Sequence, residues 1–157
     1  MLKPLQLLTP RLVLRPARAR DAQALQAAWP DADVPRWFTP APSPTAGLWL
    51  IALLRGAHDV GCVALRSSTL SPLLGNSNSN ALNPLVALWP AHRGRGYAQE
   101  ALKAVLWHAQ SASAGRSFVA VCDVPNNPGD RLLRRLGFVP GYEADGGRSR
   151  VRQYQRT

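Results

Sequence analysis

The stretch that decides the fold is "LVALWPAHRGRGYAQEALKAVLWHA", residues 85–109. It opens with "LVALW" (85–89), a continuous apolar run that predicts a buried strand ended by Pro90. A helix is predicted from about Gly96, because apolar residues then recur at the 3.6-residue period and share one face. These residues are Ala98, Ala101, Leu102, Val105 and Ala109.

A second buried strand, "SFVAVCDV" (117–124), follows this helix. Strand, helix and strand together predict a parallel pair joined by a crossover helix. Further strands are predicted at 11–16, 48–54, 59–68 and 148–156, the last as a single strand or a hairpin, and further helices at 19–29 and 126–138. The second of these helices carries local signals, with Asn127 as its cap, Pro128 in its first turn and Gly137 just past its end. Residues 68–84 read as a polar Ser/Asn loop. The order predicts an α/β fold with helices on a mixed sheet.

Size and composition favour one domain over residues 1–157, 46% of them hydrophobic. The longest apolar run, "LWLIALL" (48–54), is far shorter than the roughly 20 residues that span a bilayer. The first 16 residues, "MLKPLQLLTPRLVLRP", are interrupted by proline and arginine and do not resemble a secretory signal. We therefore expect a cytoplasmic protein without membrane contact, in which Cys62 and Cys122 are buried free thiols.

The formal net charge is +10, which favours phosphates, nucleic acids or acidic protein surfaces as partners. The basic residues of the chain are nearly all arginine, since only Lys3 and Lys103 are lysines. They are scattered along the chain rather than gathered in one run. A basic nucleic-acid-binding module is therefore kept only as an alternative.

The segment "AHRGRGYAQEA" (91–101) has the physics of an anion site. A helix N-terminus presents unpaired N–H groups and the positive end of the helix dipole. Gly94 and Gly96 allow a tight turn and a close approach of phosphate to the backbone. The segment lacks the G-K-[S/T] of a P-loop, and Gln99 stands where the dinucleotide fingerprint needs a third glycine.

The segment resembles motif A of the GNAT superfamily of acetyl-CoA-dependent N-acetyltransferases, and its closest branch looks like the RimJ/RimL type. "TPRLVLRP" (9–16) is similar to the opening strand of that branch, "WPAHRGRGYAQEAL" (89–102) to its cofactor motif, and "NNPGDRLLRRLGF" (126–138) to its closing signature. The resemblance implies a mixed sheet of about 6–7 strands, splayed at the cofactor site and flanked by about 4 helices. It also implies transfer of an acetyl group from acetyl-CoA to a primary amine, by direct attack.

The resemblance further implies where the cofactor binds. Backbone amides of the glycine segment would hold the pyrophosphate, the end of the preceding strand would pair with the pantetheine arm, and an asparagine would bond that arm. The residues so implied are Ala87, Leu88, Trp89, Arg93, Gly94, Arg95, Gly96, Tyr97, Ala98 and Asn126. No metal site is expected.

The sequence departs from the family where the acid and base usually lie. Val121, Leu133 and Gly129 occupy the positions of the family's Glu, Tyr and Ser. Asp123 and Asp130 are the substitutes that we predict for catalysis. An acetyl-CoA-binding protein of the same fold that has little catalytic activity therefore remains an alternative.

Several interpretations around the site stay open. Histidines 58, 92 and 108 and Glu100 are expected at the surface or at the edge of the core, with Glu100 pointing away from it as a first-turn charge. Trp37 and Phe38, in the proline-rich segment 29–47, either anchor the core or line the acceptor site. The acceptor is expected to be a peptide N-terminus or a small-molecule amine, because an α-amine has a pKa near 8 and needs only a weak base. A homodimer is possible for this fold.

Overall fold

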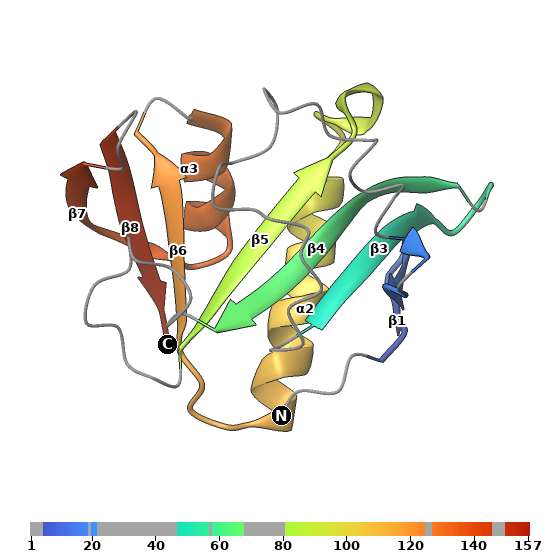
Figure 1. The fold of residues 1–157 in the computed structure, drawn as a ribbon, viewed down its shortest axis with the longest axis horizontal. Helices are drawn as coiled ribbons and strands as arrows, with labels where there is room; N and C mark the ends of the chain where they lie inside the picture. The colour runs from blue at the N-terminus through green and yellow to red at the C-terminus, as the bar shows by residue number, and fades with distance from the viewer. Residues whose placement is uncertain are drawn as a thin grey trace.

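The chain folds around one eight-stranded mixed sheet (Figure 1). A computed structural model describes residues 5–18, 20–21, 47–56, 58–67, 81–124, 127–145 and 150–157. The strand order is β1-β2-β3-β4-β5-β6-β8-β7. The strands are β1 (Leu7–Leu8), β2 (Leu12–Pro16), β3 (Gly47–Leu53), β4 (Asp59–Ser67), β5 (Leu82–Leu88), β6 (Phe118–Asp123), β7 (Val139–Asp145) and β8 (Arg150–Arg156).

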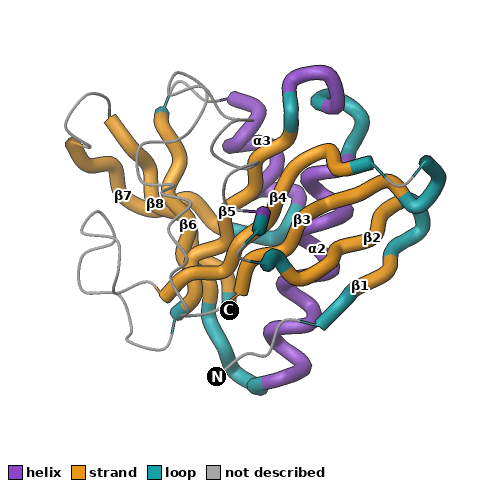
Figure 2. The backbone as a smooth tube through the Cα atoms, turned by 45° about the vertical axis from the view of Figure 1, so that its right-hand side comes forward, coloured by secondary structure: helices purple, strands orange, loops and turns teal. Residues whose placement is uncertain are grey.

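Two α-helices cover the same face of the sheet, α2 (Tyr97–Ala112) and α3 (Asn127–Arg135) (Figure 2). A short 3₁₀ helix, η3 (Pro90–His92), precedes α2. The apolar stripe predicted for α2 is buried in the main core at Ala101, Leu102, Val105 and Ala109. In the described part of the chain, no helix is long and apolar enough to cross a membrane.

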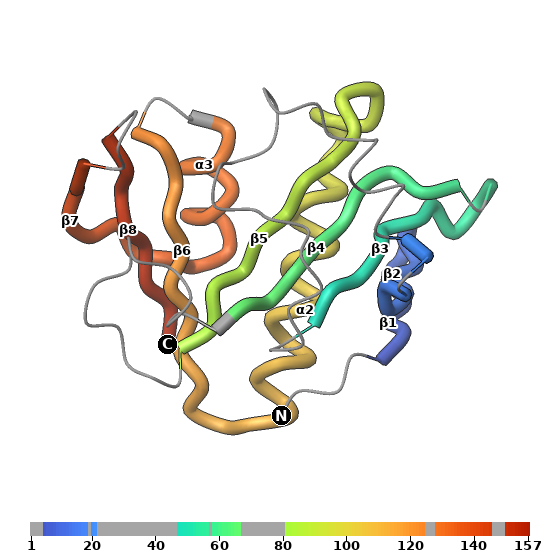
Figure 3. Tube along the Cα trace, viewed as in Figure 1, coloured from blue at the N-terminus to red at the C-terminus, as the bar shows by residue number. Residues whose placement is uncertain are grey.

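The predicted strand–helix–strand unit is confirmed, with α2 connecting the parallel strands β5 and β6. These two strands are bridged only at Leu82 and Phe118 within the described residues. From there they diverge toward their carboxyl ends, as the yellow-green and orange tubes of Figure 3 show. The expected splay of the sheet is therefore present, and its open end lies at the carboxyl ends of two parallel strands, a usual place for ligands.

Two details of the prediction need correction. The sheet has eight strands rather than six or seven, because β1 adds a short edge and β7 pairs with β8 as a hairpin, one of the two forms left open for the end of the chain. Strand β5 begins at Leu82, so residues 82–84, which read as loop, are strand. The described residues contain two α-helices and one 3₁₀ helix, and most of the helix predicted at 19–29 lies outside them.

Other local predictions hold. Gly137 ends α3 with φ 84°, and the N–H of Phe138 donates to the carbonyl of Leu133, as in a Schellman cap. Cys62 and Cys122 are buried and free. Several predictions lie outside the described residues: most of the helix at 19–29, the segment with Trp37 and Phe38, residues 68–80 of the loop predicted at 68–84, and Asn126.

Candidate functional site

The turn between η3 and α2 has the backbone of an anion cradle. Gly94 and Gly96 adopt φ values of 78° and 81°, which other residues rarely reach. Gly96 caps α2, and the cap has no side-chain hydrogen bond. The N–H of Glu100 donates to the carbonyl of Gly96 at 3.2 Å, so the N–H groups of residues 97–99 precede the bonded part of the helix.

The space over this turn fits an approaching phosphate. A Cβ added to Gly94 would meet no atom within 4 Å, and one added to Gly96 would meet only the Arg11 side chain, at 3.3 Å. Tyr97 is 8% exposed and its ring packs in the core, so a ligand at the turn can contact its backbone N–H but not its hydroxyl. The residues present therefore fit the pyrophosphate of coenzyme A, held by backbone N–H groups at a helix N-terminus.

A brace from the start of β2 holds the cradle, and the sequence did not predict it. Arg11 donates from Nη1 to the carbonyl of Arg95 (2.9 Å) and from Nε to Glu100 Oε2 (2.7 Å). Its guanidinium also lies 4.7 Å from the centre of the Tyr97 ring. Thr9 Oγ1 donates to Glu100 Oε1 at 2.5 Å. Glu100 thus ties the first turn of α2 to the N-terminal strands.

Glu100 is a first-turn charge outside the core, as expected, but its carboxylate is bound by residues of the N-terminal segment. Its side chain is 16% exposed and accepts hydrogen bonds from Thr9 and from both the backbone and the side chain of Arg11. Partial burial raises the pKa of Glu100, but the hydrogen bonds from Thr9 and Arg11 outweigh it and leave the pKa below its ordinary value. The carboxylate is therefore ionised at neutral pH.

At the end of β5, the N–H and C=O groups of every second residue face the gap between β5 and β6. Trp89 donates its N–H to Val60 of β4 at 2.9 Å, so residues 87 and 89 direct their groups toward β4. Val86 and Leu88 direct theirs toward the gap. The Leu88 carbonyl already accepts from Arg93 Nε at 3.1 Å. Of the predicted contacts at Ala87, Leu88 and Trp89, Leu88 is the one with an N–H facing the gap.

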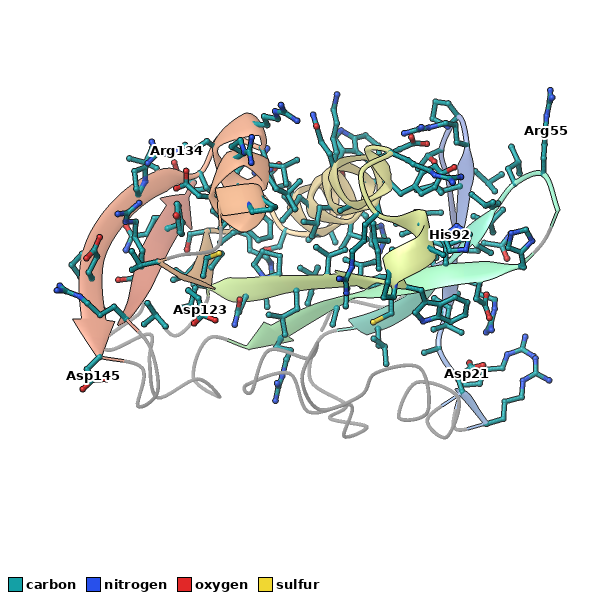
Figure 4. All side chains as sticks on the ribbon, turned by 90° about the horizontal axis from the view of Figure 1, so that it is seen from above. Asp21, Arg55, His92, Asp123, Arg134 and Asp145 are labelled. Atoms are coloured by element: carbon teal, nitrogen blue, oxygen red, sulfur yellow. The ribbon has the colours of Figure 1, made fainter. Side chains whose placement is uncertain are left out.

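The two predicted catalytic aspartates lie on different faces of the sheet. Residues 118, 120 and 122 of β6 pack in the core under the helices, whereas Val119 and Val121 belong to a cluster on the other face. By this alternation the Asp123 side chain points away from α2 and α3, as Figure 4 shows. It is exposed at the open end of the gap. Asp123 thus shares the face of Val121, the position where the resemblance expects a base.

Asp130, in the first turn of α3, is committed to other side chains. Tyr154 of β8 donates its hydroxyl to Asp130 Oδ1 at 2.5 Å, and Arg134 Nε donates to both carboxylate oxygens at 3.1 and 3.0 Å. These bonds, that of Tyr154 first, hold the pKa of Asp130 below its usual range. Burial and the bond to Asp130 raise the pKa of Tyr154 to about 12. The bonds from Tyr154 and Arg134 therefore make Asp130 poorly suited to accept a proton.

Aliphatic side chains occupy the two positions where the family resemblance implies a base and an acid. Val121 is 6% exposed and packs in the cluster on the face away from the helices, and Leu133 is 7% exposed and packs in the main core. Cys122, next to Val121, is also buried, and desolvation with the charges of Asp123 and Asp130 raises its pKa to about 11. Cys122 is therefore a neutral thiol at physiological pH, with little nucleophilic character.

Two buried nitrogens lie where β5 passes into the cradle. Trp89 Nε1 and His92 Nδ1 have no hydrogen-bond partner among the described residues. The His92 ring lies 5.8 Å from that of His58, which is exposed in the β3–β4 turn. Among the described residues, no group of three or more His, Cys, Asp or Glu could hold a metal ion.

Comparisons with known proteins agree with this geometry. The family described as "Acetyltransferase (GNAT) domain" matches residues 11–139. A GNAT-family acetyltransferase structure from Bordetella pertussis superposes with a TM-score of 0.81 at 23% identity, covering 98% of this chain and 100% of its own. No curated protein sequence matches the chain.

Two further structures are similar in fold. The ribosomal L7/L12 α-N-protein acetyltransferase RimL, solved with coenzyme A, has a TM-score of 0.74 at 18% identity and 94% coverage of both chains. A spermidine N-acetyltransferase chimera that includes the Vibrio cholerae enzyme has a TM-score of 0.72 at 13% identity, covering 92% of this chain and 94% of its own. At such identities, these likenesses establish the fold alone.

Proposed function

The chain belongs to the GNAT acetyltransferase family, and from this premise we propose that it acetylates amines of low pKa, with a peptide N-terminus as the first candidate. Acetyl-CoA is the acetyl donor of this family, and the chain is an N-acetyltransferase. The observation that carries the proposal is the position of Asp123. Its side chain is exposed on the face of the sheet away from the helices, next to the cluster that contains Val119 and Val121.

The residues of the chain divide the work between backbone and side chains. Backbone N–H groups from Gly94 to Ala98 hold the phosphates at the start of α2. The N–H groups of Val86 and Leu88 face the gap, where they can pair with an extended arm and stabilise negative charge on an oxygen. When bound, acetyl-CoA supplies the activated acetyl thioester. We place Asn126 at the cofactor arm, as the family resemblance implies.

Proton transfer falls to Asp123 in this proposal. A carboxylate is a weak base compared with an amine, and it accepts a proton well only from an amine that loses its proton easily. At pH 7 the neutral fraction of an α-amine is roughly 230 times that of a lysine amine, given pKa values near 8 and 10.4. A weak base therefore favours an α-amine or another amine of low pKa as the acceptor.

Asp130 receives a different role from the one first predicted. Its bonds to Tyr154 and Arg134 make it a fixed anion at the start of α3, next to the segment that carries Asn126. We propose that Asp130 positions this end of the helix, and that the Tyr154 hydroxyl stays protonated because it donates to a carboxylate.

A pair of peptides tests the acceptor class. Both carry the same sequence, but one has a free α-amine and no lysine, and the other has a blocked N-terminus and one internal lysine. Thiol release from acetyl-CoA at pH 7 should be at least about tenfold faster with the first peptide. Raising the pH to 9 should narrow the difference. Equal rates at pH 7 would contradict the proposed acceptor class.

A second candidate function is an acetyl-CoA-binding protein with little catalysis. It is favoured by the buried Val121 and Leu133, which have no acid–base chemistry. Binding of acetyl-CoA without thiol release over peptides, polyamines and small amines would support this second function over the first.

A further inference from the structure

The gap between β5 and β6 begins at a defined point in the sequence. Leu82 donates its N–H to the Ser117 carbonyl at 3.0 Å, in the one bridge described between these strands. In a parallel ladder the next rung would run from the N–H of residue 84 to the Val119 carbonyl. Residue 84 is proline and has no N–H, so this rung cannot form.

The carbonyls left by the missing rung are taken by a side chain. Asn83 is 4% exposed, and we assign its amide with the nitrogen toward two carbonyl oxygens. In this orientation it donates to Val119 at 3.2 Å and to Pro84 at 3.3 Å. The opposite orientation would set its oxygen against both carbonyls. A buried carbonyl without a donor is destabilising, so Asn83 stabilises the strands in their separated state.

The Asn83 side chain lies on the same face as Asp123. Leu82 and Leu88 of β5 pack in the core under the helices, and Leu85 packs in the cluster on the other face, so residue 83 also points to that other face. There it bonds Val119, whose side chain shares that face with Val121. The Asn83 amide therefore lies at the closed end of the gap, on the face where Asp123 is proposed to accept the proton of the acceptor amine.

We propose that Asn83 and Pro84 form a ladder stop that fixes where the gap opens, and that Asn83 is a positioning residue for the acyl thioester. This inference rests on the proposed function, because the gap is where the acetyl group is placed. Pro84 prevents the ladder from closing by one more rung, and Asn83 satisfies the carbonyls that an open gap would leave buried. The depth of the acyl site is thus set by these two residues.

Restoring the missing N–H tests the stop. In Pro84→Ala the new amide can donate to Val119, and the strands can close by one rung. Inserting the acetyl group must then break that bond, which should weaken acetyl-CoA binding by about fivefold to tenfold. Desulfo-CoA, which has no thioester, should bind the variant and the parent alike. Pro140→Ala in the edge strand β7 is the matched control and should change neither affinity.

Amide exchange provides a readout that does not depend on turnover. The amide of residue 84 in Pro84→Ala should be protected from hydrogen exchange, as expected for a buried rung. An exposed amide at residue 84 would overturn the ladder stop. A protected amide with unchanged acetyl-CoA affinity would also overturn it, since the gap would then not depend on this rung.

A second variant tests the side chain itself. Asn83→Asp replaces the donor amide with a carboxylate facing two carbonyls, so at pH 7 it should lower the melting temperature and weaken acetyl-CoA more than desulfo-CoA. Both defects should lessen as the pH falls and the carboxyl group becomes able to donate. Equal loss of both ligands would assign Asn83 a purely structural role. A parent chain that binds acetyl-CoA but acetylates no amine would refute the proposed function while leaving the ladder stop standing.

Discussion

The β5–α2 and β6–α3 halves of the site are both a strand followed by a helix, yet they use different parts of the chain. In the first half the chemistry lies in the backbone, at Gly94, Gly96 and the N–H groups that open α2. In the second half it depends on side chains, and the positions expected to carry acid and base hold Val121 and Leu133. We therefore propose that backbone conformation encodes cofactor binding, whereas the catalytic groups depend on which side chains the fold brings to the gap.

The largest effect is expected from a substitution in the β5–α2 half, where the backbone is proposed to bind the cofactor. Gly96→Val forces a β-branched residue into φ 81° and points its side chain at Arg11. Coenzyme A affinity, measured by calorimetry, should fall at least about 100-fold, because two or more charge-assisted hydrogen bonds of about 1.5–3 kcal/mol each are lost.

The matched control for this variant is Gly115→Val. Gly115 has φ 77° and open space around it, but it follows the far end of α2. It should carry the same backbone strain and keep its affinity for coenzyme A. Equal loss of affinity in both variants would assign the effect to stability rather than to the cradle.

The side-chain half should respond in turnover rather than in binding. Asp123→Asn removes the proposed base and should lower kcat with an α-amine peptide by about 100-fold, the lower end of the range for general bases, with coenzyme A affinity unchanged. Asp130→Asn, which alters the anion held by Tyr154 and Arg134, is the control. If Asp130→Asn lowers kcat more than Asp123→Asn does, the assigned roles are reversed.

A smaller effect is expected where β4 packs against the end of β5. A Cβ at Gly61 would lie 2.3 Å from the Ala87 carbonyl oxygen, so Gly61→Ala must displace the end of β5. Acetyl-CoA kcat/KM should fall by about tenfold and stability by about 1–3 kcal/mol, as for other overpacked sites. Gly141→Ala, whose nearest atom would be the Gln153 carbonyl oxygen at an ordinary 3.5 Å, should change neither. Unchanged kinetics in Gly61→Ala would show that the end of β5 can move without cost.

The smallest effect concerns the brace of the cradle. The native pKa of Glu100 lies below its unfolded value, so its carboxylate stabilises the fold above pH about 4–5 and this stabilisation is lost as the pH falls through the native pKa. Glu100→Gln should lower the melting temperature by about 2 °C at pH 7, and the two curves should converge near pH 3. A constant difference down to pH 3 would show that packing, not charge, is what the variant loses.

Much of the first half could be predicted from the sequence because its signals are local. The helical period of α2 and the two glycines before it stand within a few residues of one another. Residues 82–84 read as loop, because an asparagine followed by a proline is a turn signal, yet they form strand, because the sheet places the missing N–H of Pro84 at an open gap.

The brace and the Asp130 cluster could not be predicted because their partners are distant in the chain. Arg11 and Glu100 are 89 residues apart, and Asp130 and Tyr154 are 24 apart. Each pair meets only because neighbouring strands and helices pack together. The sequence signals that suggest Asp130 as a base do not include Tyr154, because no local pattern links its hydroxyl to α3.

The most direct test of the backbone-encoded cradle is the response of individual backbone amides to coenzyme A in ¹H–¹⁵N NMR spectra. The amides of Gly94, Gly96 and residues 97–98 should shift downfield on binding, as donors to phosphate do, and those of Val86 and Leu88 should also shift. These shifts should persist in Arg93→Ala and Arg95→Ala, with affinity reduced but not lost. Binding that leaves the amides of residues 94–98 unchanged, or that disappears with the two arginines, would contradict a cradle made by the backbone.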